Sequence, residues 1–444
     1  MDKAPRRASR FPWPDGVQVT REHDLAAAFP GAESGHLFIT GRAGTGKSTL
    51  LRYLREIVAD QGIVLAPTGL AAVNVGGQTI HSFFGFPPRL IRPDDIRRSR
   101  NGGLMRRLKF LIIDEVSMVR SDLMWAIDQS LRVNRGRPRE PFGGVRLLLF
   151  GDLHQLPPVV QEAEVAEHLE SNFGGPFFFD VPALRDGAGT ALLELKQVFR
   201  QDDAQLIGVL DRIREGEADE SDLELLNDRV SPIRTLGEGE QFVILTPTNA
   251  AANRINAAYL DALPGRAYAY EAGVTGDFSD SAQPTDSPLL LKAGAKVILL
   301  RNDPDRRWVN GTISRVSRLD DKRVWVEVDG KEHEVEPAAW ENRRYAYDQS
   351  AQKIVETVAG TFKQFPLRLA WALTIHKSQG LTLDKVYIDL GRGTFAHGQT
   401  YVAISRCRSL SGLAFARPLR PQDVRFDPAA MRYRDLFPLL ADSA

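Results

Sequence analysis

A glycine-rich segment near the start of the chain has the residue types and spacing that bind phosphate. It reads Gly41-Arg-Ala-Gly-Thr-Gly46-Lys47-Ser48 and lies between an apolar run at 37–39 and a helix-period segment at 47–60. Glycines in this pattern let backbone N–H groups curl around the phosphates of a nucleotide, while the lysine reaches the β- and γ-phosphates. We expect the hydroxyl of Ser48 to bind Mg²⁺. The predicted nucleotide contacts are Gly41, Gly44, Thr45, Gly46, Lys47, Ser48 and Thr49.

Two adjacent carboxylates follow a second apolar run and could complete a catalytic centre. The run Leu111-Ile-Ile ends at Asp114 and Glu115. We expect Asp114 to hold Mg²⁺ together with Ser48, and Glu115 to orient and deprotonate the attacking water. Beside the phosphate loop, this pair predicts a nucleoside triphosphatase.

A glutamine after the next apolar run is a candidate sensor of the γ-phosphate. The segment Gly151-Asp-Leu-His-Gln155-Leu-Pro-Pro follows the run at 147–150, so its amide lies at the carboxyl end of a predicted strand. An ordinary loop role for Gln155 stays open from the residue type alone. Regulatory GTPases read guanine with an N-K-x-D segment, and since the sequence has none, that class is excluded.

The elements that would position these residues form two α/β domains. Short apolar runs alternate with helix-period segments from residue 35 onward, and several runs are apolar on both faces, as buried parallel strands are. Between residues 301 and 365 the texture changes to alternating apolar and polar residues around Asp329-Gly330, which predicts a small inserted antiparallel β-barrel. The predicted parts are a tail and lead-in at 1–34, a first domain at 35–185 with a surface insertion near 83–109, and a second domain at 186–300 and 366–444.

Composition narrows the classes of partner. The 444 residues contain 57 lysines and arginines and 57 aspartates and glutamates, so the formal net charge is zero and a general basic coat is excluded. The single cysteine, Cys407, cannot form an internal disulfide, which favours a reducing compartment and a packing role, and no zinc-ligand cluster is visible. No run approaches the roughly 18 apolar residues of a membrane span, and no secretory signal is expected.

Positive charge is nevertheless concentrated in one segment. Between Pro88 and Lys109 there are eight basic residues and two acidic ones, a net charge of +6. We expect this segment to contact the phosphate backbone of a nucleic acid, and a solvated loop is the alternative. The acidic stretches Glu162 to Glu170 and Glu215 to Glu224 are expected to face solvent, away from that partner.

Five sequence blocks in a fixed order resemble the PIF-type DNA helicases of superfamily 1, which are relatives of RecD. Two further blocks are similar to the same family, and the resemblance extends from Gly35 to Leu413. The seven blocks are the phosphate loop, the AspGlu pair, GDLHQLPPV, TIHKSQGLTL, GQTYVAISR, APTGLAAVNVGGQTIHSFFGF and EVSMVRSDLMWAIDQSLRVNR.

The resemblance implies an α/β fold with two RecA-like P-loop NTPase domains, a small wedge insertion in the first and an SH3-like β-barrel inserted in the second. It implies an ATP- and Mg²⁺-dependent helicase that moves 5′ to 3′ on single-stranded DNA and unwinds tailed or forked duplexes, RNA–DNA hybrids and G-quadruplexes. Roles in DNA repair, recombination and telomere maintenance go with it, as do single-strand-binding or replication proteins as partners. The compact length is similar to that of bacterial members, so the expected location is the cytoplasm, in association with the nucleoid.

The resemblance also assigns roles to residues. Arg200 and Arg406 match the two arginines that reach the γ-phosphate from the second domain, and Gln379 and Gly380 match residues that link the nucleotide to the DNA track. The family often reads adenine with a glutamine upstream of the phosphate loop, whereas this chain has His23 near that place. Residues matched to DNA contacts are Pro67, Thr68, Gly69, His81, Thr248, Asn249, His376, Lys377 and Ser378.

Two other functions remain open from the sequence. One is an ATP-gated factor that binds single strands or remodels proteins without separating a duplex. The other is a RecD-like motor subunit of a nuclease complex, which would need partners because no nuclease cluster of carboxylates and lysine is evident.

Overall fold

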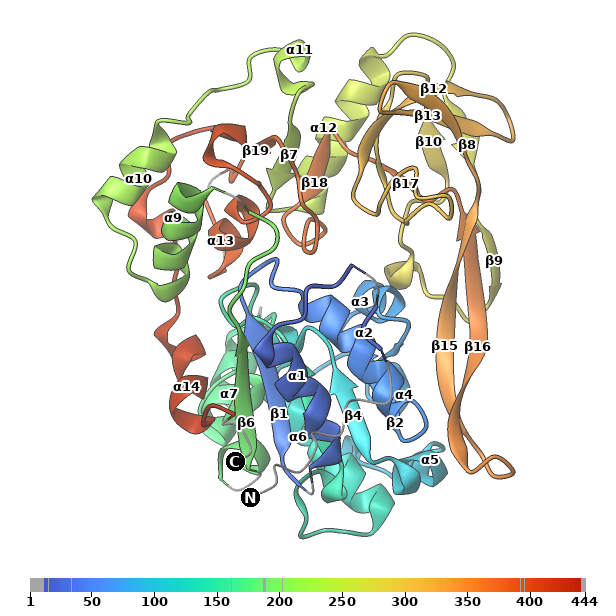
Figure 1. Ribbon diagram of the computed structural model, residues 1–444, viewed down its shortest axis with the longest axis vertical. Coiled ribbons are helices and arrows are strands. Elements are labelled where there is room, and N and C mark those ends of the chain that lie inside the picture. Colours follow the sequence, from blue (N-terminus) through green and yellow to red (C-terminus); the bar gives the residue numbers. More distant parts are fainter. Residues whose placement is uncertain are drawn as a thin grey trace, which may run out of the picture.

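The computed structural model describes residues 12–14, 16–32, 34–160, 162–186, 189–201, 203–391, 393–394 and 396–440. Two α/β domains lie one above the other in Figure 1, and a β-rich arm runs down beside both. Most of the predicted N-terminal tail, residues 1–11, lies outside the described residues. No described helix is long and apolar enough to cross a membrane.

A parallel sheet of six strands forms the centre of the first domain. Its order is β3-β2-β4-β5-β1-β6. Side chains alternate between its faces, so α2 (Lys47–Val58) packs on the face with Leu37 and Ile39, and α6 (Ser121–Arg135) packs on the opposite face with Phe38. The strands are β1 (His36–Gly41), β2 (Gly62–Ala66), β3 (Gln78–Thr79), β4 (Phe110–Ile113), β5 (Arg146–Phe150) and β6 (Thr190–Leu195).

Two segments assigned to the second domain belong to the first. Strand β6 pairs in parallel with β1 over six residues, and the C-terminal helix α14 (Tyr433–Leu436) brings Tyr433 against Phe38. The backbone N–H of Leu192 donates to the carbonyl of Pro438, so the end of the chain follows β6. The predicted boundaries at 186 and 366–444 are therefore wrong. An apolar run that is buried on both faces suits either sheet, and only pairing decides between them.

A parallel sheet of four strands, ordered β18-β7-β19-β20, forms the centre of the second domain. Helices α9, α10 and α13 cover the face that carries Leu245, and α12 covers the face that carries Ile244. Cys407 is fully buried in the first of these cores, which confirms its packing role. The elements are β7 (Val243–Thr246), β18 (Ala372–Thr374), β19 (Val386–Ile388), β20 (Leu413–Phe415), α9 (Ala204–Glu215), α10 (Glu220–Asn227), α12 (Asn249–Ala262) and α13 (Gln399–Ile404).

The inserted β-structure is larger than predicted. Five strands form an antiparallel sheet in the order β14-β13-β12-β11-β17, and Asp329 and Gly330, with φ of 51° and 72°, form the predicted two-residue turn. Strands outside 301–365 take part, so those boundaries are wrong. The strands are β8 (Tyr268–Tyr270), β9 (Gly273–Gly276), β10 (Leu289–Leu291), β11 (Lys296–Leu299), β12 (Ile313–Leu319), β13 (Val324–Val328), β14 (Lys331–Val335), β15 (Ala338–Asp348), β16 (Lys353–Gln364) and β17 (Leu367–Leu369).

The long hairpin β15–β16 reaches back to the first domain (Figure 1). The hydroxyl of Tyr345 accepts the N–H of Val64 at 3.1 Å, and Arg55 pairs with Glu356 at 2.5 Å. The second domain is thus tied to the first through the hairpin as well as across the cleft.

The basic segment is partly core, which corrects its prediction as a purely surface insertion. Ile91, Leu104, Met105 and Leu108 are buried in the first domain, because a short helix, α5 (Gly102–Arg107), packs against α6. All eight basic side chains between Pro88 and Lys109 are exposed. The remaining helices are α1 (Arg21–Ala28), α3 (Gly69–Asn74), α4 (Ile80–Phe84), α7 (Ala163–Phe173), α8 (Pro182–Arg185) and α11 (Leu236–Gly239).

Candidate nucleotide and DNA-binding site

The phosphate loop connects β1 to α2 and takes a shape that requires glycine. Gly44 and Gly46 have φ of 83° and 86°, and a Cβ on Gly44 would lie 2.5 Å from the Cβ of Arg200. The Nζ of Lys47 donates to the carbonyls of Gly41 and Arg42 at 2.6 and 2.9 Å, and burial lowers the pKa of Lys47. A lysine held only by loop carbonyls fits a site for a polyanion.

The hydroxyl residues of the loop point in different directions. Ser48 is exposed in the first turn of α2, where a hydroxyl can reach a cation beside the phosphates. Thr45 is buried, and its hydroxyl and its backbone N–H both donate to the carbonyl of Arg42, at 2.9 and 3.4 Å, so Thr45 closes the turn of the loop. Thr49 is half-buried in the same turn as Ser48.

Asp114 and Glu115 extend from the end of β4 into the same cleft. Burial, with the neighbouring charge of Glu115, raises the pKa of Asp114 to about 7, and burial also raises the pKa of Glu115. Two carboxylates crowded together favour a cation between or beside them. Glu115 has a φ of 48°, a strained value for a residue other than glycine, and the charge of Lys47 acts against the rise in its pKa, so this turn lies beside the loop. Ser48 and Asp114 therefore fit a Mg²⁺ site.

The candidate sensor Gln155 is held in place rather than free in a loop. Its Nε2 donates to Asp152 Oδ2 at 3.0 Å, and its Oε1 accepts from Gln379 Nε2 of the second domain at 3.4 Å. Asp152 is 1% exposed and was missed by the sequence analysis. Its only signal in the sequence was its place two residues after a buried strand.

Two arginines approach the cleft from the other side. Arg406, two residues after the end of α13, is 1% exposed, and its guanidinium donates to Val402, Ser405 and Ser378 of its own domain. Burial and the charge of Arg200 lower the pKa of Arg406 to about 9. Arg200 donates to the carbonyl of Gly380 at 2.9 Å, and burial lowers its pKa to about 10. In the described part of the chain no ion pair includes either arginine, and Arg200 Nη1 has no hydrogen-bond partner, so an anion between the domains could pair with both guanidinium groups.

The two domains touch at the loop through residues that sequence reasoning did not assign. The Ala43 N–H donates to the hydroxyl of Tyr401 on α13 at 3.3 Å, and Arg42 pairs with Asp211 on α9 at 2.9 Å. A Cβ on Gly398 would overlap the carbonyl of Gln155, so the start of α13 packs directly on the sensor. A buried tyrosine and a glycine give no signal in a single sequence that distinguishes such contacts from core packing.

The predicted DNA contacts gather at the carboxyl ends of strands in both sheets. Thr68 follows β2 and caps α3, accepting the Ala71 N–H at 3.2 Å, and Thr248 follows β7 and caps α12, accepting the Ala251 N–H at 3.3 Å. Both threonines are exposed, and Asn249 is exposed beside Thr248. Each domain therefore presents a similar loop.

The other residues predicted to contact DNA differ in solvent exposure. Lys377 is exposed, and Pro67, His81 and His376 are half-buried. Ser378 is 0% exposed, its Oγ donates to the carbonyl of Ile375, and its carbonyl holds Arg406, so its DNA contact stays a prediction. Gly69 packs against Ala282 of the 3₁₀ segment η6 (Asp280–Ala282), which lies over this loop.

His23 stands near the place where the family often has an adenine-reading glutamine, and here it caps the start of α1. It is buried in the first turn of α1, and its Nδ1 accepts the backbone N–H of Thr20 at 3.3 Å. Burial lowers the pKa of His23, so the ring is neutral near pH 7 and its proton is on Nε2. Nε2 lies 3.7 Å from where a Cβ of Gly46 would stand. The ring therefore offers the loop a donor, without the acceptor that a glutamine amide would add.

Comparison with known proteins agrees with this geometry. The PIF1-like helicase family matches residues 23–221. The ATP-dependent DNA helicase Pif1 of Bdellovibrio bacteriovorus is 33% identical over 95% of this chain and 93% of its own length. This chain is a PIF1-like helicase. The human ATP-dependent DNA helicase PIF1 is 32% identical over 89% of this chain, and this helicase spans 60% of the human protein. It is accordingly a DNA helicase that uses ATP.

The solved structures of Bacteroides Pif1 match this chain to different degrees, depending on whether DNA is bound. Unliganded Bacteroides Pif1 matches this helicase with a TM-score of 0.86 at 36% identity, covering 94% of this chain and 97% of that one, and its complex with ADP-AlF4 gives 0.85. The complex with single-stranded DNA gives 0.66 at the same identity and coverage. The domains of this helicase are therefore arranged more as in the DNA-free relative. In this arrangement η6 of this helicase lies against Gly69.

Proposed function

We propose that this helicase moves 5′ to 3′ along single-stranded DNA, with Mg²⁺-ATP as fuel, and separates tailed or forked duplexes, RNA–DNA hybrids and G-quadruplexes. The observation that carries the proposal is the pair of threonine-capped loops, one on each domain, on the same side as the nucleotide cleft. A motor that advances along a strand needs one grip on each of two moving parts. Pif1 of Bacteroides has been crystallised with single-stranded DNA, and another solved Pif1 structure, at 35% identity, concerns DNA unwinding at forked double-stranded DNA by two coordinating Pif1 helicases.

Hydrolysis would proceed from residues of both domains. The loop N–H groups and Lys47 would bind the phosphates, Ser48 and Asp114 would hold Mg²⁺, and Glu115 would take a proton from the attacking water. Bound Mg²⁺ would neutralise charge on the β- and γ-phosphates. Arg200 and Arg406 would stabilise the charge of the transferring phosphoryl group, and Gln155 would read its presence.

The link from nucleotide to DNA would pass through the segment after β18. Its Ser378 carbonyl holds Arg406, its Gln379 contacts Gln155, and its Lys377 side chain is exposed on the DNA side. Closure on ATP would therefore move the DNA-facing residues of the second domain together with its arginines. Release of η6 from Gly69 would open the loop of the first domain to the strand.

The inserted regions would handle the duplex. We assign the five-stranded antiparallel sheet as the SH3-like insertion and the segment 83–109 as the wedge. Its exposed basic side chains would contact phosphates near the fork, since positive charge on one face supplies most of the affinity of non-specific binding. Single-strand-binding or replication proteins would be the partners of this helicase, and in a bacterial cell the helicase would work at the nucleoid.

Strand separation on tailed substrates tests the proposal. We expect single-stranded DNA to stimulate ATP hydrolysis, and a duplex with a 5′ tail to separate while the same duplex with a 3′ tail stays annealed. Lys47→Ala is the control that should lose both activities. ATP consumption without separation of the 5′-tailed duplex would instead indicate an ATP-gated binding factor, and separation of the 3′-tailed duplex alone would contradict the direction.

A further inference from the structure

One arginine of the second domain is buried among carboxylates of the first. Arg214 lies at the end of α9 and is 3% exposed. Its guanidinium lies 3.3 Å from Glu194 on β6, 3.7 Å from Glu215 and 3.9 Å from Asp152 after β5. Glu194 and Asp152 belong to the first domain, so this side chain bridges the two domains.

Asp152 transmits this contact to the sensor glutamine. One carboxylate oxygen accepts from Gln155 Nε2 at 3.0 Å, and the other accepts the His154 N–H at 3.2 Å. Burial by itself would raise the pKa of Asp152, but the charges of Arg214 and Lys47 outweigh it and keep the pKa low. The carboxylate therefore stays ionised and holds the Gln155 amide in one orientation.

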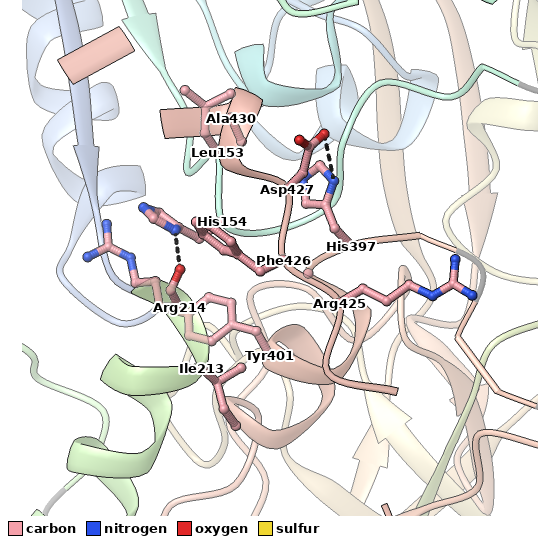
Figure 2. A pocket seen from close by; sticks show the side chains of 11 residues that line it. Leu153, His154, Ile213, Arg214, His397, Tyr401, Arg425, Phe426, Asp427 and Ala430 are labelled. Carbon is pink, nitrogen blue, oxygen red and sulfur yellow. Dashed lines mark hydrogen bonds and ion pairs between the residues drawn. The ribbon is translucent and has the colours of Figure 1, made fainter. Parts of the chain in front are cut away.

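The backbone of residue 214 is held by the same loop. The Nδ1 of His154 lies 2.7 Å from the Arg214 carbonyl, a contact drawn in Figure 2. Burial and the Arg214 charge lower the pKa of His154 to about 4, so the ring is neutral and Nδ1–H is the donor, because a carbonyl can only accept. Residue 214 thus contacts the sensor loop through a 3.9 Å ion pair of its side chain with Asp152 and a hydrogen bond of its backbone with His154. Movement of α9 and movement of that loop are linked.

We propose that Arg214 is a positioning residue for ATP hydrolysis: through Asp152 it fixes the Gln155 amide toward the γ-phosphate, and through α9 it passes the state of that sensor to the second domain. The proposal rests on the sensor role of Gln155 stated above. It differs from the roles of Arg200 and Arg406, because Arg214 acts through Asp152 and does not itself reach the phosphates. Displacement of a positioned group by about 1 Å can lower a rate by roughly a hundredfold.

A matched control exists on the same helix. Arg212 is also on α9, and its guanidinium pairs with a buried carboxylate, Asp222, which is 2% exposed. Arg212→Met and Arg214→Met each remove an arginine from α9 and leave a buried carboxylate unpaired. Arg214→Met should cost more stability, because the Arg214 side chain is 2% exposed and that of Arg212 is 45% exposed, so hydrolysis is compared at a temperature where both variants are folded. Only Asp152 holds the sensor, so the effects on hydrolysis should differ.

The experiment measures kcat and KM for ATP at saturating single-stranded DNA. We expect Arg214→Met to lower kcat at least tenfold relative to Arg212→Met, with KM changed less than about threefold, because a lost sensor acts on the transition state. Arg214→Lys, which keeps the charge without the planar fork, should restore part of kcat. A kcat for Arg214→Met within twofold of the control, or a change confined to KM, would overturn the proposal. If Arg214→Met fails to fold, Arg214→Lys carries the test and must lower kcat at least threefold.

A double-variant cycle separates this proposal from the sensor assignment. In a Gln155→Ala background, Arg214→Met should cause no further loss, since the group that it positions is already absent. Losses that multiply would overturn the proposal for Arg214. A Gln155→Ala variant that hydrolyses ATP at the normal rate would instead overturn the sensor role itself, and the two failures are therefore distinguishable.

Discussion

The nucleotide cleft and the DNA-side loops are built in opposite ways. In the cleft, side chains such as Gln155 and Arg406 are buried, and hydrogen bonds cross between the domains, from Gln379 to Gln155 and from the Ala43 N–H to Tyr401. On the DNA side, the exposed hydroxyls of Thr68 and Thr248 are bonded only within their own helices. The cleft therefore depends on how the domains are arranged, whereas the threonine cap of each DNA loop forms within one domain, and the first loop is also covered by η6 at Gly69. A motor needs this difference, because the grips must keep their shape while the distance between them changes.

The largest expected effect is in the cleft and comes from removing the general base. Glu115→Gln keeps the size of the side chain but cannot take a proton, so we expect kcat for ATP hydrolysis to fall by about 10² to 10⁴. Affinity for single-stranded DNA should be unchanged, because the DNA loops form separately. Steady-state hydrolysis and fluorescence anisotropy measure the two. Glu164→Gln, on exposed α7, is the control, and a loss of DNA affinity in Glu115→Gln would break the comparison.

A second prediction concerns pH and the buried His154 of the cleft. Its folded pKa of about 4 is below the value near 6.5 expected in the unfolded chain. The folded state then binds fewer protons between these values, so its contribution to stability is present above pH 6.5 and is lost as pH falls toward 4. We expect a loss of about 2 kcal/mol between pH 6.5 and 5. His154→Gln should reduce that slope in denaturant unfolding, and the half-buried His376→Gln of the DNA side should reduce it less. Equal slopes in the two variants would contradict the difference in burial.

A third prediction addresses the two DNA loops. Thr68→Ala and Thr248→Ala should each weaken affinity for single-stranded DNA by about tenfold, which is the contribution of a hydrogen bond to a charged group, and lower stability by about 1 kcal/mol. The kcat at saturating DNA should stay within about twofold of the parent. Thr235→Ala, which removes the cap of α11, is the matched control and should affect stability alone. Unchanged DNA affinity in both variants would show that Thr68 and Thr248 do not contact the DNA strand.

The smallest expected effect concerns the base of the nucleotide. A glutamine amide reads adenine with a donor and an acceptor, whereas His23 offers only the Nε2–H donor, which N7 of adenine and of guanine can accept equally. We expect kcat/KM for GTP to lie within about tenfold of that for ATP. His23→Gln should raise the preference for ATP. Failure of the parent protein to use GTP would show that another group reads the base.

The sequence predicted what is local and missed what depends on pairing in three dimensions. The loop at 41–48, the AspGlu pair and the Asp329-Gly330 turn follow from residue types at fixed spacing. The assignment of β6 to a sheet, the bridge from Arg214 to Asp152 and the burial of Ser378 each depend on which segments meet, and the sequence around them shows only apolar or charged residues in ordinary positions. The resemblance supplied Arg200 and Arg406, which spacing alone would have left as surface ion pairs.

Binding of a transition-state analogue tests most directly whether the two domains form one hydrolytic site. The affinities of ADP and of ADP with aluminium fluoride would be measured for the parent, Arg406→Ala and Arg200→Ala, with Arg408→Ala, an exposed neighbour, as control. We expect ADP to bind all four proteins alike, and the analogue to bind the first two variants at least a hundredfold more weakly than the parent or the control. Equal affinity of all four proteins for the analogue would contradict the cross-cleft arginines and with them the coupling of hydrolysis to domain closure.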